Sequence, residues 1–288
     1  MSDCIDTNVR LSPARESFLA LSRQIFGLAF APWDEKGYWT DRYRPYALVR
    51  DGQVVANASA NIIDTRVDGV KKRYIQIGTV MCHPDFRGQG LMRRVMGALM
   101  ADWQDRCDAM YLYGNDSVLE FYPKFGFSAD REYIHSGAVT PCGGDFVPLD
   151  MDQPEGVALL RRLYAQGNPY SALPMLDNFG LIMFDCGFFL KRNVFYSPRH
   201  GVACVAEQEG DTLLLHDVFG ASDAPLTQLI AQIAAPDTKR VTLGFTPLDE
   251  APFTCAPLYE DDQTLFVLRG KENVFAQRHV RFPFLSHA

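Results

Sequence analysis

The sequence has 288 residues, enough for two domains of ordinary size. Hydrophobic residues make up 47% and charged residues 22%, as in globular proteins, and no apolar run approaches the ~18–20 residues that a membrane span needs. A net charge of −7 argues against a general nucleic-acid binder, which would carry a basic face. The N-terminus shows no basic segment followed by an apolar core, so we expect a cytoplasmic protein. The net charge and the lack of a long apolar run predict that it binds neither nucleic acid nor membranes.

Seven cysteines are scattered along the chain, with no C-x-x-C pair and no histidine cluster beside them. They stand at positions 4, 82, 107, 142, 186, 204 and 255. The odd number and irregular spacing favour free thiols in a reducing compartment, and no metal is expected.

The first half alternates helices and strands. Apolar residues at helical spacing predict a helix over 12–28. Two Asp-Gly pairs, at 51–52 and 68–69, separate β-rich runs and predict two hairpin turns. A third strand, over 74–82, ends before Pro84, because proline cannot continue a ladder of hydrogen bonds.

Further periodic segments follow, and a stretch rich in Gly, Pro and Asp separates the two halves. Helices are expected over 88–106, 116–124, 153–166, 177–187 and 223–235. Strands are expected over 110–113, 188–196, 202–208, 211–218, 239–246 and 263–269. We therefore expect an α/β protein with a domain over 1–140, a linker over 141–152 and a second domain over 153–288.

A glycine-rich turn after the strand at 74–82 opens the helix at 88–106. Helix N-termini leave backbone N–H groups unpaired and carry partial positive charge. Gly88 and Gly90 have no side chains there, so a pyrophosphate could approach those N–H groups closely. No Gly-Lys-Ser/Thr follows, and no third glycine fits, so the turn is neither a Walker loop nor a dinucleotide fingerprint.

The turn, Arg87-Gly88-Gln89-Gly90-Leu91-Met92, resembles the (Gln/Arg)-x-x-Gly-x-(Gly/Ala) loop of the GNAT superfamily of acyl-CoA-dependent N-acetyltransferases. A second GNAT signature, an Asn followed by an aromatic-Tyr pair and Gly-Phe, corresponds to Asn115 through Phe127. Met92 departs from the family's small residue but keeps a backbone N–H. The resemblance implies a GNAT fold with a mixed sheet, and a degenerate GNAT-like second half, which lacks both motifs.

The resemblance also implies how acetyl-CoA, the expected cofactor, would be held. The pantetheine arm would lie along the strand end at Val80, Met81 and Cys82. The pyrophosphate would contact Arg87, Gly88, Gln89, Gly90, Leu91 and Met92. Asn115 would lie along the coenzyme A arm, and Tyr122 would protonate the leaving thiolate as general acid.

The general base is less clear from the sequence, because the position where some relatives carry Glu holds Gln76, and an amide is not a base. Candidates elsewhere in the first half are His83, Glu120, Asp34 and Glu35. The aromatic residues Trp33, Tyr38 and Trp39 could shape the acceptor pocket and hold a cationic amine by cation–π contact.

The apolar tail, residues 281–288, offers another candidate. A GNAT half with motifs followed by a half without them resembles the tandem-domain mycobacterial enhanced-intracellular-survival acetyltransferases, in which the terminal carboxylate serves as base. The resemblance therefore implies that the carboxylate of Ala288, or the side chain of His287, reaches the first domain's site.

We therefore expect an N-acetyltransferase that moves an acetyl group directly from acetyl-CoA to a primary amine of a small molecule or peptide. Gln76 and Met92 keep open a non-catalytic protein that binds or senses acyl-CoA. Acyl transfer to a hydroxyl group, transfer from a longer-chain donor and a homo-oligomeric state also remain open.

Overall fold

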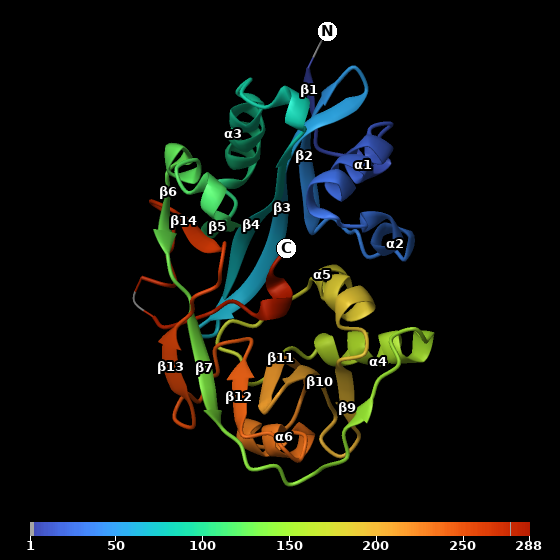
Figure 1. Ribbon diagram of the computed structural model, residues 1–288, viewed down its shortest axis with the longest axis vertical. Coiled ribbons are helices and arrows are strands. Elements are labelled where there is room, and N and C mark those ends of the chain that lie inside the picture. The colour runs from blue at the N-terminus through green and yellow to red at the C-terminus, as the bar shows by residue number, and fades with distance from the viewer. Residues whose placement is uncertain (1–2, 277) are drawn as a thin grey trace.

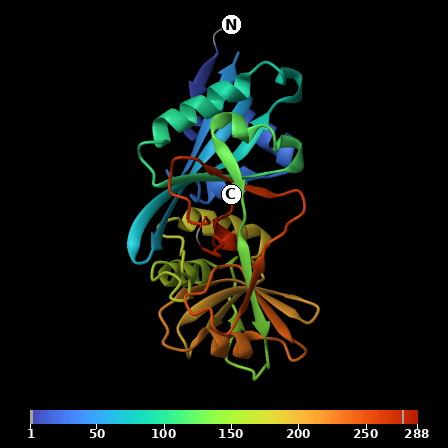
Figure 2. The same ribbon diagram turned by 90° about the vertical axis from the view of Figure 1, so that its left-hand side faces the viewer.

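The computed structural model describes residues 3–276 and 278–288, and it shows two bodies stacked along the long axis (Figures 1 and 2). Each body is built on a mixed sheet of seven strands. This arrangement confirms the expected α/β class with mixed sheets. Among the described residues, no helix combines the length and apolarity that a membrane crossing requires.

The first sheet has the order β1-β2-β3-β4-β5-β14-β6. Its strands are β1 (Cys4–Asp6), β2 (Tyr43–Arg50), β3 (Gln53–Val67), β4 (Val70–Cys82), β5 (Ala109–Gly114), β6 (Phe127–Asp130) and β14 (Thr264–Leu268). The turns joining β2 to β3 and β3 to β4 are the predicted Asp-Gly pairs, and each pair adopts positive φ angles. Only β4 and β5 are parallel neighbours, and helix α3 (Leu91–Trp103) connects them.

Helices cover both faces of the first sheet. Leu91, Val95 and Leu99 of α3 pack against one face, in the same core as Ile75 and Leu112. On the opposite face lie α1 (Arg15–Phe26) and α2 (Phe30–Glu35), in a second core that continues into the other body.

The second sheet has the order β8-β9-β10-β11-β12-β7-β13. Its strands are β7 (Tyr133–Ala138), β8 (Val147–Pro148), β9 (Val194–Ser197), β10 (Val202–Glu209), β11 (Thr212–Gly220), β12 (Arg240–Leu243) and β13 (Thr254–Pro257). Helix α6 (Leu226–Ile233) connects the parallel pair β11 and β12, as α3 connects β4 and β5. Helices α4 (Pro154–Tyr164) and α5 (Phe179–Phe184) lie between this sheet and the first body (Figure 1).

The two sheets repeat one topology, with the sixth strand exchanged between them. In the first sheet β14, from the end of the chain, pairs antiparallel with β5 and β6. In the second sheet β7, from the first half, pairs antiparallel with β12 and β13. The second sheet is therefore GNAT-like in topology, but the segment before α6 reads Ala-Ser-Asp-Ala-Pro and has no glycine-rich loop.

The sheets divide the chain differently from the predicted ranges 1–140 and 153–288. Strand β7 precedes the predicted linker at 141–152 yet belongs to the second sheet, and β8 lies inside that linker. The helix predicted over 116–124 is instead two 3₁₀ turns, Asp116–Val118 and Tyr122–Phe125, because Pro123 interrupts the helical hydrogen bonds.

The strand predicted over 188–196 begins only at Val194. A π-helical turn, Asp185–Phe189, extends α5 through the first part of that range. A short apolar run does not distinguish helix from strand, and here Asn178 caps α5 by accepting a hydrogen bond from the Leu181 N–H at 3.3 Å.

The exchanged strand predicts that stability of the first body depends on Phe266. This β14 side chain is 2% exposed and packs in the α3 core beside Tyr122. We expect Phe266→Ala to lower the free energy of unfolding by about 3–5 kcal/mol, as for other buried aromatic truncations, in a urea titration. Phe189→Ala, at a side chain that is 63% exposed, is the control and should change it by less than about 0.5 kcal/mol. Equal effects of both substitutions would contradict the exchange.

Candidate active site

The site begins where β4 parts from β5. The two strands pair only from Tyr74–Ile77 to Ala109–Leu112, although β4 runs on to Cys82. Just beyond the last pair, the register of β4 with β3 shifts, and Thr79 adopts a φ of 47°, which is unusual for a β-branched residue. The edge of β4 beyond Ile77 is therefore open toward β5.

A buried hydrogen-bond network holds Thr79 in this conformation. The Tyr43 hydroxyl donates to Thr79 Oγ1 at 2.9 Å and accepts from Ser59 Oγ at 3.0 Å. Asn57 Nδ2 donates to the Thr79 carbonyl at 2.9 Å. Backbone strain of this kind persists only where neighbouring contacts determine it, and these three polar residues of β2 and β3 supply the contacts.

A cleft of about 810 Å³ opens between the parted strands. It brings together most of the residues predicted to bind coenzyme A or to act on the thioester. Of these, the cleft is lined by Val80, Met81, Cys82, Arg87, Met92, Asn115, Tyr122, His287 and Ala288. Burial raises the pKa of the Cys82 thiol, which favours its protonated form.

The glycine-rich turn has the conformation that an anion-binding loop requires. Gly88 and Gly90 have φ angles of 75° and 71°, and open space lies where a Cβ atom would stand at either position. Gly90 caps α3, so the first N–H groups of the helix face the open loop. Gln89 and Leu91 offer only backbone groups, because Gln89 Oε1 accepts from Arg50 and Leu91 packs in the core.

Tyr122 stands at the inner end of the cleft and is nearly buried. Its Cε2 atom lies 2.8 Å from where a Cβ atom would stand at Gly114, so only glycine admits the ring there. Burial raises the pKa of the Tyr122 hydroxyl to about 12, so it carries a proton at neutral pH. A protonated phenol facing the cleft is a proton donor.

The C-terminal tail is fixed between the two bodies (Figure 1). The Arg281 backbone donates to and accepts from Thr246 Oγ1, at 2.6 and 3.2 Å. The buried Glu132 accepts from the Phe282 N–H at 2.8 Å, and the Phe284 N–H donates to the Gly244 carbonyl at 2.7 Å. These bonds join the tail to the second sheet and aim its last residues at the first.

The last two residues of the tail reach the parted strands. His287 stacks on Tyr113 of β5, and its Nε2 shares a hydrogen bond with the Tyr113 hydroxyl at 2.9 Å. Burial lowers the pKa of His287 to about 3, so the ring is neutral. Ala288 lies against β4: a Cβ atom at Gly78 would stand 2.6 Å from the Ala288 carbonyl oxygen and 3.1 Å from its carbonyl carbon.

The other candidate bases lie outside the cleft. His83 Nδ1 accepts from the Asp85 N–H at 3.3 Å in the loop, and Glu120 and Glu35 are exposed. Asp34 is paired with Arg10 and Arg15. Gln76, at the position where some relatives carry Glu, is fully buried, and neither polar atom of its amide has a partner among residues 3–276 and 278–288.

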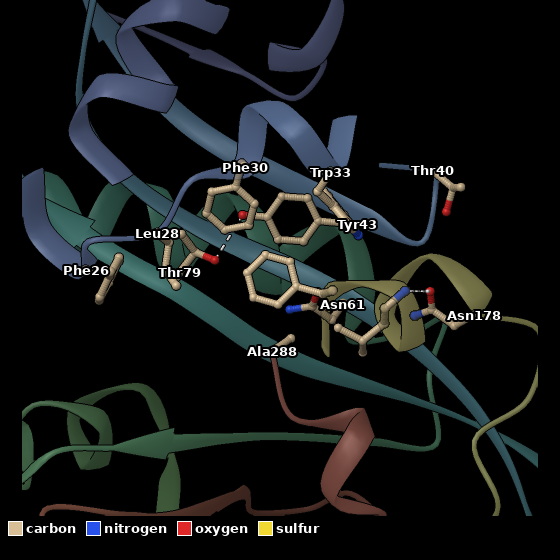
Figure 3. A pocket seen from close by; sticks show the side chains of 12 residues that line it. Phe26, Leu28, Phe30, Trp33, Thr40, Tyr43, Asn61, Thr79, Asn178 and Ala288 are labelled. Carbon is tan, nitrogen blue, oxygen red and sulfur yellow. Dashed lines mark hydrogen bonds between the residues drawn. The ribbon is translucent and has the colours of Figure 1, made fainter. Parts of the chain in front are cut away.

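A small apolar pocket adjoins the cleft, and sequence reasoning missed most of its residues (Figure 3). Of the three aromatic residues expected there, Trp33 lines the pocket, whereas Tyr38 does not and Trp39 is enclosed in the core. Phe184 of α5 and Ala288 line both the pocket and the cleft. Nothing in the sequence of the second half marks Phe184 as a contributor to a site.

Asp185, the first residue of the π-helical turn, also lines the cleft and was not anticipated. Burial raises its pKa from 3.8 to about 7. The folded state thus binds the proton more tightly than the unfolded chain, so this residue's contribution to stability is present below about pH 3.8 and is lost as the pH rises to about 7.

We therefore expect Asp185→Asn to raise the melting temperature relative to the parent chain, by an amount that grows between about pH 4 and pH 7 and is constant above. Thermal unfolding followed by circular dichroism across this range measures the difference. Glu35→Gln, at an exposed carboxylate, should show no such trend. A constant difference for Asp185→Asn at every pH would contradict the raised pKa.

A family model described as "Acetyltransferase (GNAT) family" matches residues 16–127, and no curated protein matches the sequence. Three solved structures resemble nearly the whole chain. A conserved protein from Enterococcus faecalis V583, a probable N-acyltransferase, has 13% identity and a TM-score of 0.63 over 93% of this chain and 72% of its own. A GCN5-related N-acetyltransferase from Kribbella flavida has 14% identity and a TM-score of 0.57 over 92% and 71%.

Eis1 from Mycobacterium abscessus has 16% identity and a TM-score of 0.54 over 92% of this chain and 73% of its own. At these identities the structures establish a common fold, and their coverage extends across both sheets. The matched range includes the parted strands, the glycine-rich loop and Tyr122, which together form the cleft. Residues 16–127 of the chain therefore form a domain that matches the GNAT family of acetyltransferases.

Proposed function

We propose that the chain transfers an acetyl group from acetyl-CoA directly to a primary amine, with Tyr122 as general acid and, in a chain that ends at Ala288, the terminal carboxylate as general base. The observation that carries the proposal is the meeting of Tyr122 and Ala288 in one cleft, on either side of the parting between β4 and β5. Residues far apart in the sequence converge there.

The cleft fits an acyl-CoA donor in two respects. The edge of β4 at Val80–Cys82 has lost β5 as a partner, so it offers backbone groups to the amides of a pantetheine arm. The loop at Arg87–Met92 offers N–H groups at a helix N-terminus to the phosphates. A thioester supplies an activated acyl carbon next to a thiol leaving group.

The chemistry needs two proton transfers. The amine nitrogen bonds to the acyl carbon while the carbon–sulfur bond breaks. Because the nitrogen becomes far more acidic as that bond forms, the Ala288 carboxylate can accept its proton. Tyr122, which is protonated at neutral pH, gives its proton to the departing sulfur.

We expect Tyr122→Phe to lower kcat by about 10²-fold or more, since the variant keeps the ring but loses the proton donor. Release of free thiol from acetyl-CoA, followed over a panel of primary amines, measures the rate. Calorimetry should find the affinity for coenzyme A unchanged. Tyr259→Phe, at a side chain that is 76% exposed, is the matched control. An unchanged kcat in Tyr122→Phe would remove Tyr122 from the mechanism.

The role of the tail is tested by two changes that move the carboxylate. Two glycines appended after Ala288, or Gly78→Ala, should each lower kcat/KM at neutral pH by about 10²-fold. In Gly78→Ala the new methyl group would occupy the place of the Ala288 carbonyl oxygen. The remaining activity should rise with pH up to the pKa of the amine, as in the parent chain, because only the neutral amine has an electron pair that can attack the thioester.

Gly97→Ala is the control for the second change, because open space lies where its Cβ atom would stand. Full activity in both tail variants would exclude the carboxylate as base. Tight binding of coenzyme A without thiol release for any amine would instead favour the acyl-CoA-binding protein that Gln76 and Met92 keep open.

A further inference from the structure

The apolar pocket of Figure 3 adjoins the cleft. It meets the cleft at four shared residues, Phe26, Thr79, Phe184 and Ala288. Its remaining walls come from α2, β2 and β3 of the first body and from α5 of the second. A group seated in this pocket is therefore beside the Ala288 carboxylate and away from the loop that would hold phosphates.

The wall of the pocket is aromatic. Phe30 stacks on Tyr43 with ring centroids 5.6 Å apart, and Trp33 meets the edge of Tyr43 at 5.7 Å. Phe184 packs on Phe30 at 5.5 Å. Among the described residues that line the pocket, none has a charged side chain. The Ala288 carboxylate is then the charge that faces a ligand.

The polar groups of the wall already have protein partners. Trp33 Nε1 donates to the Gly180 carbonyl at 2.7 Å, and the Tyr43 hydroxyl is bonded to Thr79 and Ser59. Asn178 donates to the Ile62 carbonyl at 3.3 Å. A polar or multiply charged ligand would therefore lose its hydration without new hydrogen bonds in return.

The volume of the pocket limits the size of the chemical group that can bind in it. At about 150 Å³ it has the size of a protein cavity that holds one benzene molecule. A single aromatic ring, or a branched alkyl group of five or so carbons, fills such a space. A sugar ring of similar size would leave its hydroxyl groups unpaired against the aromatic wall.

Resting on the proposed function, we infer that the acceptor is a primary monoamine that carries one aryl or branched alkyl group, and that this group binds in the pocket. The ammonium lies at the shared residues, where the Ala288 carboxylate balances its single charge and the aromatic faces add cation–π attraction. Polyamines and amino sugars are disfavoured, because their further charges have no counterpart in the pocket and could meet only Asp185 in the cleft, whose pKa of about 7 leaves it partly neutral.

A first experiment ranks four amines by thiol release from acetyl-CoA with the full chain. The amines are 2-phenylethylamine, 3-methylbutylamine, ethylamine and spermidine. We expect kcat/KM for the first two to exceed that for ethylamine by about 100-fold, since each apolar carbon buried in a fitted pocket adds a severalfold factor. A value for spermidine above that for 2-phenylethylamine would overturn the inference while leaving the acetyltransferase intact.

A second experiment fills the pocket. Leu28→Trp places a bulky ring at the half-buried rim, and Leu181→Trp does so in the buried wall. Each should lower the ratio of kcat/KM for 2-phenylethylamine to kcat/KM for ethylamine by about 10-fold or more, because the larger amine loses more of its buried contact. Leu248→Trp, at an exposed site, is the control. If Leu181→Trp fails to fold, the rim variant decides.

Two further measurements separate the alternatives. If hexanoyl-CoA reacts faster than acetyl-CoA, and Leu28→Trp abolishes that advantage, then the pocket holds the chain of the donor and the inference is wrong. Calorimetry with 2-phenylethylamine and ethylamine tests the pocket even where no amine is acylated. Binding of the first alone, lost in Leu28→Trp, would support the inference, and no binding of either would contradict it.

Discussion

The parting of β4 from β5 at Gly78 and Thr79 is the constraint on which the site depends. Parallel strands that stayed paired to their ends would leave neither a free strand edge nor a cleft. Three polar residues on the neighbouring strands, Asn57, Ser59 and Tyr43, determine the bend by satisfying Thr79 in a strained conformation. The open edge of β4, the cleft that Tyr122 lines and the apolar pocket all lie beside that bend.

The second body has no glycine-rich loop before α6, but it contributes residues to the site of the first body. It supplies α5 to the wall of the pocket, and it fixes the tail through Thr246, Gly244 and the buried Glu132. Burial raises the pKa of Glu132 to about 7, so a carboxyl group otherwise costly to bury is partly neutral in this role. The second body, whose sheet repeats the topology of the first, thus holds the C-terminal residues in place. The exchanged strands β7 and β14 join the two bodies.

Local signals predicted the local features. The glycine-rich turn, the Asp-Gly hairpins and the signature around Tyr122 are contiguous in sequence, so their spacing was informative. The strand exchange was not predictable from the sequence, because the pattern of apolar and polar residues along β14 would be the same in either sheet. In the sequence, Gly78 is an ordinary residue inside a predicted strand. The need for glycine there comes from close contact with Ala288, which is 210 positions later in the chain and gives no local signal. Asp34 was expected near the acceptor, but ion pairs with two arginines occupy it.

The position of β14 near the end of the sequence has a consequence for how the chain folds during translation. Domains generally fold from the N-terminus as the ribosome releases them, but here the first sheet has a gap between β5 and β6 until Thr264–Leu268 emerge. During most of translation, the nascent chain therefore carries two unpaired strand edges beside an unfinished core. Unpaired strand edges are templates for pairing with strands of other chains, and β14 covers both of these edges when it joins the sheet. The cleft is likewise incomplete until His287 and Ala288, which line it, have emerged.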